Sequence, residues 1–126
     1  MDEANILSPA FEREMNAVLG QYERATKHQL VIFTTANMGG QPVDQYSLAL
    51  ANRLQIGRKG YNDGLMLLVA PVEQKVRIEV GKGMESAITN AESKRIIVAN
   101  IVPEFSKNNF ASGIRNGANA MMKEAP

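Results

Sequence analysis

The chain has 126 residues, of which 44% are hydrophobic and 21% charged, a composition typical of a single globular domain that spans 1–126. Fourteen Lys and Arg against thirteen Asp and Glu give a net charge of +1, which argues against a nucleic-acid binder, because such proteins concentrate basic residues on one face. There is no cysteine and only one histidine, His28. Disulfides, thiolate nucleophiles and zinc sites made of Cys or several His residues are therefore excluded.

The first part of the chain is predicted to form a helix followed by a buried strand. Ser8 is a typical helix cap, and it precedes Pro9, which is favoured in a first turn. Apolar residues at spacings of three and four then predict a helix over 9–26. The stretch QLVIFTT at 29–35 is β-branched and apolar without polar alternation, which is typical of a strand covered on both faces.

The middle of the chain is predicted to add a second helix and a hairpin. A loop that contains Gly39-Gly40 leads to a helix opened by Pro42, and LMLLVA at 65–70 forms a second buried strand. Pro71 ends this strand, and only residues 72–74 then precede the alternating stretch KVRIEV at 75–80. The two strands are therefore predicted to pair antiparallel, with one wetter face on the third strand.

The C-terminal part is predicted to contain two helices. Thr89 and Glu92 fit a capping box at the start of the first helix, and Pro103 is expected to kink its last turn. Asn109 is expected to cap the final helix. The order of elements predicts an α/β fold: a three-layer α/β/α sandwich, Rossmann-like, whose small mixed sheet contains a right-handed βαβ crossover and a β-hairpin.

The hairpin is expected to bring the loop GRKGYNDG, at 57–64, next to the stretch GKGME at 81–85. Asn62, Asp63 and Glu85 would then supply side-chain oxygens, and the flanking glycines would let backbone carbonyls turn inward. Oxygen-only ligation is what calcium or magnesium prefers, so these three residues are a candidate metal site. The alternative interpretation is that Asn-Asp-Gly is a turn and that Glu85 is a solvated charge.

Other polar residues are weaker candidates for binding or catalysis. Arg58 and Lys59 are candidates for binding an anion, but their residue types favour a charged surface loop. The loop is not a nucleotide-binding P-loop, because no Gly-Lys-Ser/Thr follows a strand and opens a helix. Thr34 and Thr35 end the first strand, where ligand crevices often lie, but threonine is also a common strand former. His28 has no Ser or Asp arrangement beside it and is interpreted as a surface residue.

Several motifs occur in the order found in TPM-domain proteins. They are LSP at 7–9, GQPV at 40–43, IGRKG at 56–60, NDGLMLLVAP at 62–71, KVRIEVG at 75–81, GME at 83–85, RII at 95–97 and the segment 110–113. Through these motifs the chain resembles the TPM-domain family over nearly its whole length.

The resemblance implies a three-layer α/β domain that is exported, and periplasmic or membrane-anchored in the full-length protein, with the given chain as a soluble domain. Relatives are associated with photosystem II repair in thylakoids, with acetylcholine-receptor modulation in animals and with unassigned bacterial envelope proteins. Acid phosphatase activity and calcium binding are attributed to some members. The family's acidic loop corresponds to Asn62-Asp63, and its glycine-flanked acidic motif corresponds to Gly83-Met84-Glu85.

Three positions depart from the family pattern. Lys82 stands where an aromatic residue is common, Ser86 where Gly is often found, and Asn90 where Asp is frequent. Lys82 adds a positive charge and Asn90 removes a negative one. Both changes weaken the expected affinity for a cation and favour an anionic ligand.

Two functions remain open from the sequence. The leading hypothesis is a calcium-binding envelope domain with weak acid phosphatase activity, in which Asp63 and Glu85 hold the ion and Arg58 or Lys59 steadies a small phosphoester. The alternative is a non-enzymatic interaction module that assists the assembly or turnover of a membrane protein complex, since the chain has no evident nucleophile and base. We expect no binding of nucleic acid, and we expect the domain to be a monomer.

Overall fold

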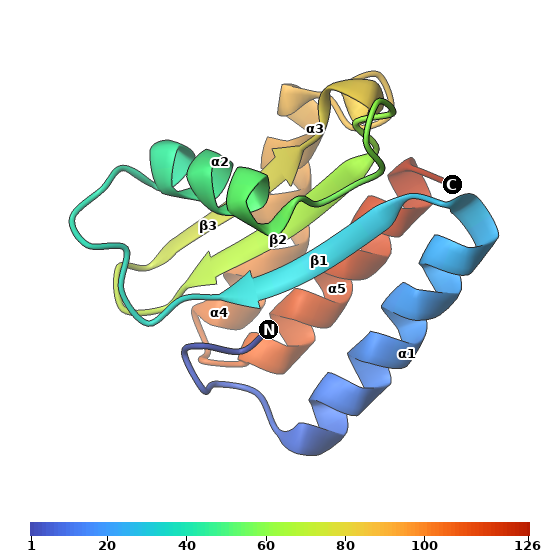
Figure 1. The fold of residues 1–126 in the computed structure, drawn as a ribbon. Coiled ribbons are helices and arrows are strands. Elements are labelled where there is room, and N and C mark those ends of the chain that lie inside the picture. Colours follow the sequence, from blue (N-terminus) through green and yellow to red (C-terminus); the bar gives the residue numbers. More distant parts are fainter.

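Helices and strands follow one another in the predicted α/β order (Figure 1). The computed structural model describes residues 1–126. The elements are α1 (Pro9–Thr26), β1 (Gln29–Thr34), α2 (Val43–Leu54), β2 (Gly64–Ala70), β3 (Lys75–Val80), α3 (Asn90–Ile96), α4 (Val102–Phe105) and α5 (Phe110–Glu124). A 3₁₀ turn, Lys82–Met84, follows β3, and a π-helical segment, Ile97–Ile101, joins α3 to α4.

The three strands form one mixed sheet in the order β1-β2-β3. β1 and β2 are parallel, with Leu30 opposite Leu65, so the chain must cross over between them, and α2 makes this crossover. β2 and β3 are antiparallel, with Leu67 opposite Ile78, as the short connection between them predicted. The central strand β2 is buried along its whole length.

Helices cover both faces of the sheet, which makes the predicted three-layer sandwich. Figure 1 shows α2 alone on one face and α1, α3, α4 and α5 on the other. Apolar packing follows the same division. A cluster of 17 buried residues joins the sheet to α1, α3 and α5, whereas a cluster of four joins it to α2. The α2 side is therefore the thinner of the two apolar layers.

The smaller cluster consists of Leu50 from α2 and three strand residues, Phe33, Met66 and Leu68. Met66 and Leu68 point to this face, whereas Leu65 and Leu67, their neighbours along β2, belong to the larger cluster. Alternate residues of a strand point to opposite faces, so β2 contributes to both clusters. β1 does the same, with Leu30 and Ile32 in the larger cluster and Phe33 in the smaller one.

The helix boundaries agree with the caps in the sequence at two places and differ at two. The Ser8 hydroxyl accepts from the amide of Phe11, and Thr89 and Glu92 form the predicted capping box. Asn109 occupies the cap position of α5, but its side chain donates to Glu104 instead of capping the helix. Pro103 was expected to kink the last turn of its helix, but the irregularity begins earlier, at the π-helical segment, and Pro103 lies in the first turn of α4.

The two edges of the sheet are protected differently. Residues 1–3 run parallel to the end of β1: the amide of Thr34 donates to the carbonyl of Met1, and the amide of Glu3 donates to the carbonyl of Thr34. Along the opposite edge, β3 alternates charged Lys75, Arg77 and Glu79 with apolar residues. Charges on an edge strand discourage pairing with another chain.

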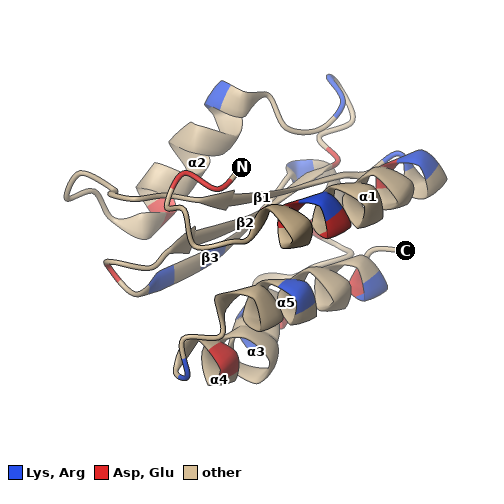
Figure 2. Ribbon diagram, turned by 90° about the horizontal axis from the view of Figure 1, so that it is seen from below, with Lys and Arg blue, Asp and Glu red and all other residues tan.

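Charges of both signs are scattered over the surface elements. Figure 2 shows Lys and Arg interspersed with Asp and Glu on the helices and loops, and no one helix carries only basic residues along its length. None of the helices is long and apolar enough to cross a membrane.

Candidate functional site

The two loops singled out in the sequence lie against each other, and we call residues 57–64 and 81–85 the loop pair. The amide of Gly81 donates to the carbonyl of Gly64 at 2.8 Å, and the amide of Gly83 donates to the carbonyl of Asn62 at 2.9 Å. The juxtaposition predicted from the hairpin is therefore confirmed. The loop pair lies at the start of both parallel strands, because the carbonyl of Asp63 accepts from the amide of Gln29.

Asp63 is buried and fully engaged by Arg58. Only 4% of Asp63 is exposed. One carboxylate oxygen accepts from the Arg58 amide at 2.7 Å, and the other accepts from the Arg58 side-chain Nε at 2.6 Å. The Asp63 carboxylate therefore closes the loop back to Arg58, which lies five residues earlier in the chain. We call this pairing the Arg58–Asp63 clamp.

The clamp also sets the protonation of Asp63. Burial by itself would raise the pKa of this carboxyl, but the hydrogen bonds from the Arg58 amide and side chain, with the Arg58 charge, outweigh it and lower the pKa below its usual range. Asp63 is therefore an anion at neutral pH, with its charge matched by Arg58.

Arg58 is held on its other side by an aromatic ring. Its guanidinium carbon lies 4.0 Å from the centre of the Tyr61 ring, a cation–π contact. Tyr61 is 63% exposed, so the ring is largely open to solvent although its position is fixed by the loop. Lys59 and Lys82 are exposed in the same loop pair and form no ion pair. The loop pair thus presents a basic and aromatic surface.

The remaining candidate metal ligands do not complete a cation site. Asn62 and Glu85 are exposed, and neither side chain forms a hydrogen bond or an ion pair. No group of three or more His, Asp or Glu side chains lies close enough together to hold a metal ion. Because both oxygens of Asp63 accept from Arg58, the donor set in this arrangement does not fit a calcium ion.

The glycines of the loop pair allow the backbones of the two loops to pack closely. A side chain at Gly83 would collide with the carbonyl of Tyr61, and one at Gly81 would collide with the carbonyl of Asn62. The sequence had suggested that glycines turn carbonyls toward an ion. In the structure the carbonyl of Asn62 accepts from the amide of Gly83, so this carbonyl links the two loops.

A hollow of about 290 Å³ adjoins the loop pair on the α2 side of the sheet. Four of its lining residues are polar or charged and carry side chains able to bind a ligand: Asn52, Asn62, Glu79 and Lys82. Glu79 already accepts from the Ser47 hydroxyl at 2.8 Å. The hollow contains no Ser, Thr or His side chain, and so it offers no nucleophile paired with a base.

A second polar cluster, which the sequence indicated only through two threonines, lies at the other end of β1. Thr34 and Thr35 are fully buried, and the Thr35 hydroxyl bonds to the Tyr46 hydroxyl at 2.8 Å. The Thr34 hydroxyl donates to Asp2 at 2.7 Å. Glu73 accepts from the amide of Met38. These bonds tie the chain start, the α2 helix and the β2–β3 connection to the end of β1 and the loop that follows it. No signal short of the three-dimensional fold would have paired them.

The fold and the loop pair define the class of protein. It is a small α/β/α domain in which two glycine-rich loops pack against each other at the start of two parallel strands. The TPM domain family model matches residues 1–124. The chain therefore belongs to the TPM-domain family, as its motifs indicated.

Solved structures agree with this assignment. The N-terminal domain of a protein from P. gingivalis, determined by solution NMR, is 30% identical, with a TM-score of 0.90 over 98% of this chain and 78% of that one. The BA42 protein from the psychrophilic bacterium Bizionia argentinensis is 15% identical, with a TM-score of 0.80, and the two chains are covered to 94% and 80%.

The N-terminal domain of the cg2496 protein from Corynebacterium glutamicum is 17% identical, with a TM-score of 0.72 over 99% of this chain and 78% of that one. At these lower identities the likeness concerns the fold alone. A search of curated proteins finds no match.

Proposed function

We propose that this TPM domain is a non-enzymatic interaction module that assists the assembly or turnover of a membrane protein complex, with the loop pair as one of its contact surfaces. The Arg58–Asp63 clamp is the observation that carries this proposal. It withdraws the one buried carboxylate of the loop pair from chemistry and fixes the loop that presents Tyr61 and Arg58.

The chemistry of the exposed surface also supports a binding role. Tyr and Arg are enriched among the residues that contribute most to protein interfaces. A fixed loop loses little conformational entropy when it binds, and this favours affinity. Lys59 and Lys82 add positive charge around Tyr61, so a partner surface with acidic groups would be complementary. An exported or envelope-anchored location for the whole protein belongs to the same proposal.

A phosphatase is the second candidate, and one observation favours it: the matching family model is named for a phosphatase. In this proposal Arg58 and Lys59 would bind the anion of a small phosphoester, and calcium would bind through Asn62, Asp63 and Glu85. The proposal requires Arg58 to leave the Asp63 carboxylate when the ion enters, because both oxygens are otherwise engaged.

A phosphatase assay separates the two candidates. Wild type and Asp63→Asn are incubated with p-nitrophenyl phosphate at acidic pH, with and without calcium. The interaction module predicts no turnover above the buffer rate in any of the four reactions. Calcium-dependent turnover that Asp63→Asn abolishes would instead establish the phosphatase.

The melting temperature in the presence of calcium tests the metal site independently of catalysis. An ion at about 100 times its dissociation constant stabilises the folded protein by about 2.7 kcal/mol. We expect no change in the melting temperature at millimolar calcium. A rise that is lost in Asp63→Asn and in Glu85→Gln would show that the clamp opens for the ion, and it would restore the metal site.

A further inference from the structure

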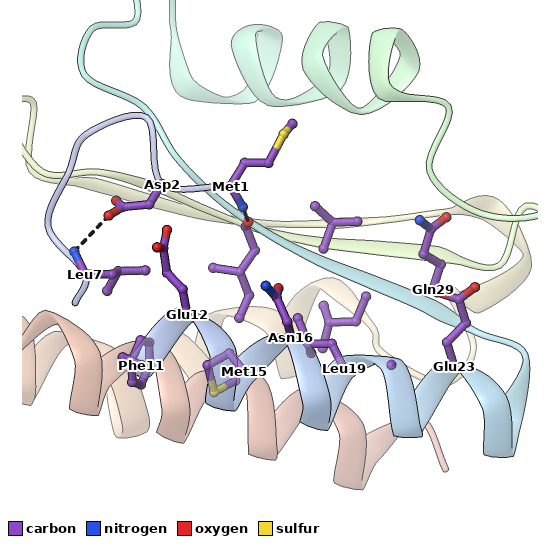
Figure 3. Close-up of a pocket in the computed structure, with 14 residues that line it drawn as sticks. Met1, Asp2, Leu7, Phe11, Glu12, Met15, Asn16, Leu19, Glu23 and Gln29 are labelled. Carbon is purple, nitrogen blue, oxygen red and sulfur yellow. Dashed lines mark hydrogen bonds between the residues drawn. The ribbon is translucent and has the colours of Figure 1, made fainter. Parts of the chain in front are cut away.

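Two hollows of similar volume lie against the sheet. The first, of about 490 Å³, runs between α1 and β1, and Figure 3 shows Met1, Asp2 and Leu7 along it beside the side chains of α1. The Met1 ammonium donates to the carbonyl of Ile32 at 2.7 Å, and Asp2 accepts from the amide of Leu7 at 2.9 Å. The first residues of the chain thus contact the β1 side of this hollow themselves.

The second hollow, of about 480 Å³, lies where the turn between β2 and β3 meets α4 and the start of α5. Its apolar lining includes Val76, Val102, Phe105 and Phe110, and we call it the α4 pocket. The volume is within the range of roughly 300–1,000 Å³ seen for ligand sites. The carboxyl end of β2 also lines it, and α/β proteins commonly bind ligands at this end of a parallel strand. The π-helical segment Ile97–Ile101 leads directly into it, and such segments are frequent at functional sites.

The aromatic wall of the α4 pocket is fixed by packing. The rings of Phe105 and Phe110 meet edge to face, with centroids 5.1 Å apart and an interplanar angle of 64°. A Cβ at Gly113 would lie 2.5 Å from the Phe105 ring, so the glycine lets this ring lie directly on α5. Both rings are only partly buried. The pocket therefore presents a preformed aromatic wall to an incoming apolar group.

Exposed valines border the α4 pocket. Val102, which lines it, is 44% exposed, and Val98, four residues earlier on the π-helical segment, is 66% exposed. Val72 follows the lining residue Pro71 and is 77% exposed. Contiguous exposed apolar surface marks an interaction site. A small molecule inside the pocket would leave these valines in water, whereas a segment of a partner protein would cover them as well.

The only charged residue that lines the α4 pocket is Lys75. The other polar residues of the lining are Gln74, Ser106 and Asn108, and no Asp or Glu is among them. Lys75 is exposed and forms no ion pair. The pocket thus combines an apolar wall with an uncompensated positive charge. A complementary partner segment carries a carboxylate close to an apolar side chain.

We propose that the α4 pocket binds a segment of a partner protein in which an aromatic or leucine side chain stands two residues from an aspartate or glutamate. The apolar side chain fills the pocket against Phe105 and Phe110, and the carboxylate pairs with Lys75. Alternate residues of an extended segment point to the same side, so these two positions face the pocket together. The loop pair lies at the opposite end of β2, so this surface does not depend on the function proposed for the loop pair.

The probe is the capped peptide Leu-Phe-Val-Asp, titrated into the ¹⁵N-labelled 126-residue protein. We expect chemical-shift changes centred on the amides of Val76, Val102, Phe105 and Phe110, because these residues line the pocket. Replacing the phenylalanine of the peptide by alanine is expected to remove binding. Replacing its aspartate by asparagine is expected to weaken binding about two- to fivefold, the effect of one partly exposed ion pair.

A pair of protein variants tests the apolar wall. Val102→Asp places a carboxylate in the lining and is expected to abolish binding of the peptide. Leu48→Asp is the matched control and binds as wild type, because Leu48 is 53% exposed but lies on α2, outside the pocket. The peptide substitutions use the wild-type protein, so they test the same contact even where Val102→Asp fails to fold.

A second pair of variants tests the charge. Lys75→Gln is expected to bind the peptide about two- to fivefold more weakly, and to bind the aspartate and asparagine peptides equally well. Lys94→Gln changes an exposed lysine that does not line the pocket. It is the matched control and distinguishes between the two peptides as wild type does.

Several results would overturn the proposal. They are the absence of any shift at millimolar peptide, equal binding of the phenylalanine and alanine peptides, and equal binding of the aspartate and asparagine peptides by wild type. Concentration-dependent shifts at Val102 and Phe105 without peptide would assign the pocket to a second copy of this chain. The same shifts with phosphatidylcholine vesicles alone would assign it to a lipid surface. Shifts confined to the loop pair would reject the α4 pocket as the site, while leaving the interaction role of the loop pair intact.

Discussion

Replacing Asp63 by Asn keeps the shape of the side chain and removes its charge. The Arg58 guanidinium then faces a neutral amide in a buried position. Hydrogen bonds to charged groups contribute about 1.5–3 kcal/mol, so we expect Asp63→Asn to lower the free energy of unfolding by about 2 kcal/mol. Urea denaturation measures this change. Glu85→Gln, the same substitution at an exposed and unpaired carboxylate, is expected to shift stability by less than about 0.5 kcal/mol.

The same residue makes stability depend on acid. Folding lowers the pKa of Asp63 from its ordinary value, which is about 3.9 in an unfolded chain, so the unfolded chain takes up the proton first as the pH falls. The stabilisation is complete above about pH 5 and is lost as the pH falls through the folded pKa. We expect the unfolding free energy of wild type to fall more steeply on acidification than that of Asp63→Asn. Parallel curves would contradict the clamp.

The sequence placed the candidate residues near one another, but it did not predict how they pair. Arg58 and Asp63 are five residues apart, and Asn62 between them adopts a left-handed backbone conformation with φ of 52°. That conformation decides whether the carboxylate turns toward Arg58 or toward the second loop. Residue types and spacing alone could not decide between these two orientations of the carboxylate. The opposite charges of Arg58 and Asp63, on either side of a glycine turn, were nevertheless a usable signal.

At the scale of elements, the loop pair depends on glycines that permit backbone contact. A Cβ at Gly83 would collide with the carbonyl of Tyr61. Neither loop backbone can move away without breaking the hydrogen bond from the Gly83 amide to the Asn62 carbonyl. We expect Gly83→Ala to destabilise the protein by about 3 kcal/mol, the upper end for overpacking. The melting temperature monitors the change.

Gly60 is the control for that substitution, since it lies in the same loop pair at φ of 86° and has open space where a Cβ would project. Gly60→Ala carries only the cost of a left-handed conformation, about 1–2 kcal/mol. Equal effects of the two substitutions would refute close packing of the loops.

The helices and strands themselves were largely predictable, because their signals are local. Caps at Ser8 and Thr89 and the uninterrupted apolar run of β2 fixed three boundaries to within a residue. The π-helical segment Ile97–Ile101 was not predicted. There α5 packs closely, with Gly113 against Phe105 and Gly117 against Ile101, a long-range contact that no local pattern encodes.

At the scale of the whole molecule, β2 joins the two apolar clusters into one folding unit. We expect Leu50→Ala, in the smaller cluster, to lower stability by about 2–4 kcal/mol. The measurement is hydrogen exchange of the α2 and α5 amides, with far-UV circular dichroism for the whole chain. All are expected to report one shifted transition. Loss of α2 while α5 stays protected would show instead that the α2 layer unfolds alone.

The three-layer architecture could be predicted from the order of elements, but the unequal coverage of the two faces of the sheet could not. The sequence indicated helices on both sides of a small sheet, and it could not show that α2 alone covers one face. Nor could it show that residues 1–3 return to the end of β1. Both features arise from contacts between segments that are distant in the chain.

The unequal edges of the sheet limit how many chains can associate through it. β3 carries the charged residues Lys75, Arg77 and Glu79, whereas residues 1–3 pair with the end of β1, where Leu30 and Ile32 are buried. Neither edge presents a long bare apolar strand to a second chain, so extension of the sheet from one chain to the next is disfavoured at both edges. Fibrous growth by edge-to-edge pairing is therefore disfavoured for this domain.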